Sequence, residues 1–216
     1  GRSPAWSREW GRTGALGTLG AALAEAYAVL TEGDVTGISL FGGADLGSTR
    51  IVLELRADQL SALVAIAVAL VAFCVQVYSV GYLADAEEDP AAPTRYPAYV
   101  AAVSLFTAAM MLVIHADDLI LLLVGWEVMG ACSYLLVGHH SERASARAAA
   151  VKAFLVTRVG DLGVLIAVVV LLAGAGTTSI RTLNESAATL PPTTVTVAAL
   201  LLLGYPVAFA LAANGI

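Results

Sequence analysis

Three charged side chains interrupt two strongly apolar stretches of this sequence. Glu127 stands within the run 122–130, and Arg158 and Asp161 stand within the run 154–161. An ionisable group at the middle of a lipid-embedded helix costs about 2.5–3.5 kcal/mol on insertion scales, so such residues mark ion and proton pathways. Arg158 and Asp161 are three residues apart, so they share a helix face and can neutralise each other. Glu127, on an adjacent antiparallel helix at similar depth, would complete a buried cluster that can bind and release protons.

A structural role is the alternative for the same cluster. Polar groups across membrane helices also hold those helices together. An internally compensated pair such as Arg158 and Asp161 could serve that purpose alone. For this pair both readings stay open, whereas Glu127 favours a functional reading.

Three further residues could take part in proton transfer at the helix ends. Lys152 lies about one turn inside its apolar run, where it could join the pathway or extend its ammonium group to the headgroups as an anchor. His139 and His140 follow another run and titrate in the range needed for proton entry, although two histidines at a helix end are also ordinary interfacial residues.

Metal and redox chemistry find little support in the sequence. His115 precedes Asp117 and Asp118 in a short polar turn, but no second group of ligands occurs at a useful spacing. Cys74 and Cys132 both lie within apolar runs, so we expect two small buried side chains rather than a disulfide or a metal pair. We therefore predict no metal, no haem, no cluster and no other cofactor.

The composition excludes an ordinary soluble protein. Hydrophobic residues make up 59% of the 216 residues and charged residues only 13%, against about 25% charged residues in a typical soluble domain. Most of the surface must therefore face lipid. The formal net charge of −6 comes from acidic residues concentrated between the apolar runs, and no basic region suggests nucleic-acid binding.

Six apolar runs predict an all-α, polytopic bundle of about six membrane spans, since a helix needs roughly 20 apolar residues to cross the hydrocarbon core. The first run is short, contains Glu25 and follows several arginines, so a signal peptide is the alternative. We favour a membrane helix there. The runs are 14–30, 59–83, 98–114, 118–138, 148–173 and 194–213.

Lysine and arginine are distributed unequally between the two sides of this bundle. Alternate connections would place seven on one side and three on the other. By the positive-inside rule the richer side is cytoplasmic, so the amino end and the loop 139–152 would lie inside and the segment 31–58 outside. The richer side holds Arg2, Arg8, Arg12, Arg95, Arg143, Arg147 and Lys152; the other holds Arg50, Arg56 and Arg181.

Several motifs make the sequence similar to a known family. They are Asp-Gln-Leu-Ser at 58–61, Gly-Trp-Glu at 125–127, Cys-Ser-Tyr-Leu-Leu-Val-Gly at 132–138, Lys-Ala-Phe at 152–154 and Thr-Arg-Val-Gly-Asp at 157–161. Over about 55–203 the chain resembles the subunit L family of bacterial NADH-quinone oxidoreductase (respiratory complex I). Related subunits M and N and the multisubunit sodium/proton antiporters share the Trp-Glu element but usually lack Thr-Arg-Val-Gly-Asp.

The resemblance implies a proton-translocating membrane subunit that couples quinone reduction to pumping. Glu127 then matches the family's buried glutamate on the fifth helix, and Arg158 and Asp161 match its charged pair on the sixth. The family's NADH and quinone chemistry lies in other subunits, so no redox site is implied here. The implied location is the bacterial plasma membrane, and the implied partners are other membrane subunits such as a subunit M-like neighbour.

The sequence also departs from that family. The family continues with a helix carrying an essential lysine in a Gly-Lys-Ser-Ala-Gln context, whereas Lys152 is the only lysine here and 204–216 reads differently. We expect a subunit truncated at both ends, with a helix and external loop at 1–58, an antiporter-like region at 59–203 and a divergent tail at 204–216. A sodium/proton antiporter subunit and a non-functional membrane fragment remain the alternatives.

Overall fold

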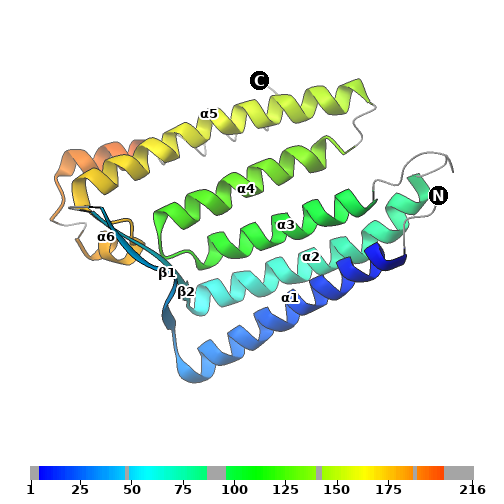
Figure 1. Ribbon diagram of the computed structural model, residues 1–216, viewed down its shortest axis with the longest axis horizontal. Coiled ribbons are helices and arrows are strands. Elements are labelled where there is room, and N and C mark those ends of the chain that lie inside the picture. The colour runs from blue at the N-terminus through cyan, green and yellow to red at the C-terminus, as the bar shows by residue number, and fades with distance from the viewer. Residues whose placement is uncertain (1–4, 47–48, 87–95, 140–142, 187–188, 202–216) are drawn as a thin grey trace.

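The computed structural model describes residues 5–46, 49–86, 96–139, 143–186 and 189–201. The chain folds into a bundle of long helices with a two-stranded sheet across one end (Figure 1). The elements are α1 (Ala5–Glu32), β1 (Val35–Leu46), β2 (Thr49–Ala57), α2 (Gln59–Ala86), α3 (Tyr96–His115), α4 (Leu119–Val137), α5 (Ala144–Ala175) and α6 (Ile180–Ser186), followed by a short helix, Pro192–Leu201.

Each of the five helices α1 to α5 contains a segment that is long and apolar enough to cross a membrane. The predicted helical membrane bundle is thus confirmed. The first run, for which a signal peptide was the alternative, lies in a continuous span of 24 residues, Glu9–Glu32. The sixth predicted run is described only as far as residue 201, where it forms the apolar helix Pro192–Leu201.

Small residues lie between the helices and large apolar residues lie outside. Ala22 on α1 and Ala65 and Ala69 on α2 form a buried cluster against which Met111 of α3 packs. By contrast, large side chains such as Leu63 on α2 are 66% exposed. This is the reverse of a soluble protein, because lipid chains solvate the outer leucines and helix contact depends on close backbone approach.

Glycine makes the closest of these approaches possible between α3 and α4. A Cβ at Gly125 would lie 2.7 Å from Cγ2 of Val113 and 3.1 Å from the carbonyl oxygen of Ala109. No larger residue fits there without moving one of the helices. Gly125 thereby lets α4 pack closely against α3.

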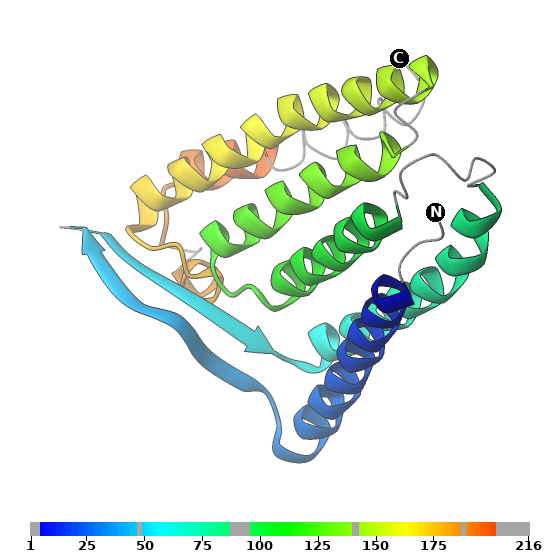
Figure 2. The same cartoon turned by 45° about the vertical axis from the view of Figure 1, so that its right-hand side comes forward.

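The segment 31–58, expected as an external loop, contains an antiparallel hairpin. β1 pairs with β2 from Val35 opposite Ala57 to Leu46 opposite Thr49. Figure 2 shows the hairpin crossing the end of the bundle from the α1–α2 side toward the α5–α6 side. The backbone N–H of Asp117, between α3 and α4, donates to the carbonyl of Glu54 on β2 at 3.0 Å. The hairpin is therefore fastened to the helices that it crosses.

Asp58 caps the helix that follows the hairpin. Its Oδ1 accepts the backbone N–H of Ser61 at 2.8 Å, and the Ser61 hydroxyl oxygen accepts the backbone N–H of Asp58 at 2.8 Å. This reciprocal arrangement satisfies backbone donors at the start of α2. The hydrogen bond from the Ser61 backbone holds the pKa of Asp58 below its usual value, with Arg56 as a weaker contributor.

A second aspartate joins two helix connections at the same end. Asp118 is fully buried and caps α4 by accepting the backbone N–H of Ile120 at 2.8 Å. Its other carboxylate oxygen accepts the hydroxyl of Thr178, in the α5–α6 connection. The backbone N–H of Leu119 also donates to the Thr178 carbonyl at 2.9 Å. This junction fixes where α4 and α5 begin and end relative to each other.

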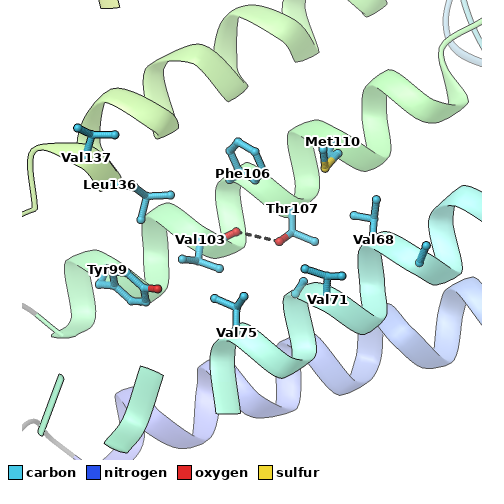
Figure 3. Close-up of a pocket in the computed structure, with 12 residues that line it drawn as sticks. Val68, Val71, Val75, Tyr99, Val103, Phe106, Thr107, Met110, Leu136 and Val137 are labelled. Carbon is cyan, nitrogen blue, oxygen red and sulfur yellow. Dashed lines mark hydrogen bonds between the residues drawn. The ribbon is translucent and has the colours of Figure 1, made fainter. Parts of the chain in front are cut away.

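An apolar groove of about 720 Å³ lies between α2, α3 and the end of α4 (Figure 3). Val68, Val71 and Val75 line one side. The hydroxyl of Thr107 is turned to its own helix, donating to the Val103 carbonyl at 2.9 Å. None of the twelve lining residues is charged and most are aliphatic, so the groove suits contact with lipid.

Candidate functional site

The guanidinium of Arg158 lies between two carboxylates on two helices. Its Nη1 contacts Oε2 of Glu127 on α4 and lies 3.5 Å from Oδ2 of Asp161 on α5. Its Nη2 also donates to the backbone carbonyl of Glu127 at 3.3 Å. These contacts agree with the helix face predicted to be shared by Arg158 and Asp161. They also agree with the similar depth predicted for Glu127.

Neighbouring residues fix the orientation of this guanidinium. Its Cζ lies 4.7 Å from the ring centroid of Phe154, one turn earlier on α5, in cation–π geometry. The Phe154 ring in turn contacts Tyr134 of α4, with the centroids 5.3 Å apart. A Cβ at Gly130 would lie 3.4 Å from Nη2 of Arg158. The absence of a side chain at Gly130 thus leaves room for Arg158 beside the α4 backbone.

Trp126 holds the second carboxylate. Its indole N–H donates to Oδ1 of Asp161 at 2.9 Å across the α4–α5 interface. From the sequence, Trp126 was recognised only as part of a motif, and this role was missed. A signal was present, because an indole N–H in an apolar span needs an acceptor and Asp161 lay on the neighbouring helix.

The two acids of the cluster have different environments. The side chain of Asp161 is 6% exposed, whereas that of Glu127 is 37% exposed. Asp161 is held by Trp126 and Arg158 together, while Glu127 lies at the open side of the α4–α5 contact. With both acids ionised the three residues carry one net negative charge, which a single proton cancels. Glu127 is thus the less covered of the two acids.

The other predicted residues lie away from this cluster. Lys152 is exposed on α5, six residues before Arg158, which places it roughly 120° around the helix and about 9 Å along it. The His139 ring packs edge-on against Tyr99 with centroids 5.4 Å apart, and it lies about 18 Å along the axis from Glu127 by residue spacing. His140 lies outside the described residues. Proton entry at this end stays a prediction.

Of the two cysteines predicted to be buried, only one is buried. Cys132 is fully buried, as expected, but Cys74 is exposed on α2, so its prediction as a buried residue was wrong. An apolar run has a lipid side as well as a bundle side, and the run alone does not distinguish them. Within the described ranges, no three residues among His, Cys, Asp and Glu gather as a set of metal ligands.

Two family models match this chain. Residues 116–213 match the model described as "NADH:quinone oxidoreductase/Mrp antiporter, TM". Residues 44–94 match the model described as "NADH-Ubiquinone oxidoreductase (complex I), chain 5 N-terminus". The first match contains all three charged residues of the cluster together with Trp126.

Individual proteins show the same similarity. NADH-quinone oxidoreductase subunit L of Mycobacterium tuberculosis is 35% identical over 181 residues, which are 82% of this chain and 28% of that protein. NAD(P)H-quinone oxidoreductase chain 5 of Synechocystis is 34% identical over 173 residues, 79% of this chain and 24% of that protein. The chain thus spans about a quarter of the length of these relatives.

A solved structure shares the fold. The match is to the membrane-bound sulfane sulfur reductase, an archaeal respiratory membrane complex, with a TM-score of 0.77 over 93% of this chain and 38% of the matched one. The sequence identity is 19%, so this likeness concerns the fold alone.

Proposed function

Because this chain belongs to the family of antiporter-like membrane subunits that includes subunit L and chain 5 of the NADH:quinone oxidoreductases, we propose that it forms a proton-handling segment of such a subunit. In this proposal Glu127 binds and releases the proton. Arg158 is its ionic partner, and Asp161 is the alternative partner of the guanidinium. Lys152, His139 and His140 are proposed to serve proton transfer toward one end of the bundle.

The observation that carries the proposal is the sharing of Arg158 between Glu127 and Asp161. An ionised glutamate is stabilised while the guanidinium lies close to it. When the guanidinium turns to Asp161, Glu127 loses that partner in a medium that disfavours charge, and a proton replaces it. Asp161 keeps the arginine neutralised in both arrangements.

Movement between α4 and α5 would switch these two arrangements. Glu127 and Arg158 lie on different helices, whereas Arg158 and Asp161 lie on the same one. A small shift of α4 along α5 therefore changes the first contact and preserves the second. Events elsewhere in a complex can drive such a shift only if they stabilise one position of Arg158, near Glu127 or turned to Asp161, more than the other. We propose that quinone reduction in neighbouring subunits provides that bias.

The proposed surroundings follow from the family and the charge distribution. The chain would work in the plasma membrane beside other membrane subunits, including a subunit M-like neighbour, with the richer share of lysine and arginine facing the cytoplasm. It would carry no redox centre of its own.

The experiment is Glu127→Gln in the membrane complex that contains this chain. The amide keeps size and hydrogen bonding but cannot carry the transferred proton, and Arg158 keeps Asp161 as a partner. We expect the complex to assemble and proton pumping to be lost or sharply reduced in reconstituted vesicles. Glu32→Gln, an exposed residue at the end of α1, is the matched control and should pump normally. Pumping at the wild-type rate in Glu127→Gln would leave the cluster with a structural role only.

A sodium/proton antiporter subunit is the second candidate, because the matching family model names Mrp antiporters as well. The same vesicles distinguish the two. If the transport that Glu127→Gln removes requires sodium and no quinone substrate, the antiporter assignment holds. If it requires quinone reduction and is independent of sodium, the oxidoreductase assignment holds.

A further inference from the structure

Glu25 and His115 meet at the end of the bundle that carries the hairpin. Glu25 is on α1, and His115 is the last residue of α3. The Nε2 atom of His115 lies 2.8 Å from Oε1 of Glu25, and the Nδ1 atom lies 2.7 Å from the carbonyl oxygen of Met111. Both side chains are largely covered, with 16% of His115 and 24% of Glu25 exposed.

The two contacts of the His115 ring determine how many protons the ring and the Glu25 carboxyl group must carry together. A carbonyl oxygen only accepts, so Nδ1 must carry a hydrogen and donate it to Met111. In a neutral ring Nε2 is then a lone-pair acceptor, and it faces an oxygen that also only accepts when Glu25 is ionised. Two lone pairs at 2.8 Å repel each other. The contact therefore needs one more proton, placed either on Nε2 or on the carboxyl group of Glu25.

We propose that Glu25 and His115 form a proton-binding site, separate from the Glu127 cluster, and that the bound proton fastens α1 to α3. The ligand is the proton itself, shared between an imidazole nitrogen and a carboxylate oxygen. Glu127 lies eight residues into α4, about 12 Å deeper along the helix axis. The new site therefore does not belong to the cluster and does not depend on the proposed function.

The site lies where three helices pack together. α1, α2 and α3 meet there through Ala22, Ala65 and Met111. Nearby Arg56 is engaged with Asp34 at 3.2 Å. The other charged residues described at this end are Glu32, Glu54, Asp58, Asp117, Asp118, Arg181 and Glu185.

Removing the proton should loosen the helix contact. Once both Nε2 and the carboxylate are unprotonated they repel, so α1 loses a polar attachment to α3. The attachment therefore exists only while the pair holds that proton, so loss of the proton at higher pH removes it. Glu25→Gln should abolish this dependence, because the amide N–H can donate to a neutral ring and the amide oxygen can accept from a protonated one.

The first test counts protons in the chain embedded in lipid nanodiscs. Nitrogen NMR of ¹⁵N-histidine distinguishes protonated from unprotonated ring nitrogens. The infrared difference spectrum between wild type and Glu25→Gln shows whether the carboxyl group of Glu25 is protonated. Where α1 and α3 are in contact we expect either a doubly protonated His115 ring or a protonated Glu25. A ring with bare Nε2 beside an ionised Glu25 would overturn the proposal.

The second test measures the distance between α1 and α3. Spin labels at the exposed positions Leu30 and Ala108, in a background with both native cysteines replaced by alanine, should move apart as pH rises. Glu25→Gln should hold one distance at all pH values, whereas Glu32→Gln should behave like wild type. Equal pH dependence in Glu25→Gln and wild type would show that another group responds. Neither test measures proton transport, so both results can be interpreted even if the proposed role of Glu127 in pumping is wrong.

Discussion

The indole N–H of Trp126 reaches across the α4–α5 interface to Oδ1 of Asp161 at 2.9 Å, and the other oxygen of the same carboxylate lies 3.5 Å from Arg158. One carboxylate thus has a neutral donor from the neighbouring helix and a cation from its own. Glu127, directly after Trp126, contacts the same Nη1 of Arg158 that lies near Asp161. Adjacent residues of α4 therefore hold the two ends of one charged network.

Trp126→Phe should destabilise the chain and disturb the network. Phenylalanine retains the ring but leaves one oxygen of buried Asp161 without its donor, at a cost of about 1–3 kcal/mol. We expect a lower midpoint of thermal unfolding in detergent and reduced pumping in the complex. Trp10→Phe is the matched control, since Trp10 is 72% exposed on α1. Equal losses in the two variants would contradict a specific role for the indole N–H.

Arg158→Ala should cost more stability than Asp161→Ala. Removing the arginine leaves Glu127 and Asp161 both uncompensated, and breaking a buried pair typically costs about 3–5 kcal/mol. Removing Asp161 still leaves Arg158 with Glu127. The double variant should cost less than the sum of the single ones, because the two residues interact. Strict additivity in this double-mutant cycle, measured by unfolding, would argue against the pair.

Acidification should weaken the start of α2. The pKa of Asp58 is lowered by its hydrogen bond from the Ser61 backbone. A lowered pKa means that the stabilisation is present above the unfolded-state pKa and is lost as pH falls through the folded-state value. Asp58→Asn should keep a cap and lose this pH dependence, while Asp58→Ala should cost about 1 kcal/mol at neutral pH. Thermal unfolding from neutral to acidic pH measures all three proteins.

The hairpin and the start of α5 should face opposite sides of the membrane. The unequal distribution of lysine and arginine predicts this, with Ser145 inside and the hairpin outside. Cysteines placed at Ser39 and Ser145, both exposed, should react with an impermeant thiol reagent from opposite sides. Cys74 must first be replaced because it is exposed. Labelling of both new cysteines from the same side would refute the predicted topology.

Hydrophobicity and helix geometry determined the main outline of the protein from the sequence. Long apolar runs have no stable alternative to helices in lipid, because every backbone group must be satisfied within the segment. The same argument selected Glu127, Arg158 and Asp161, since a charge in such a run is costly. The spacing of three residues was by itself enough to place Arg158 and Asp161 on one helix face.

Contacts between distant segments were decided only by the tertiary structure. The hairpin pairs two strands and is fastened to the α3–α4 connection through Glu54 and Asp117. The hydrogen bond from Trp126 to Asp161 and the contact between His115 and Glu25 link residues 35 and 90 positions apart. Periodicity indicates which face a residue occupies, but it does not identify the partner across an interface. That choice follows from how the helices approach, for example through Gly125, and close packing of this kind is a property of the assembled bundle.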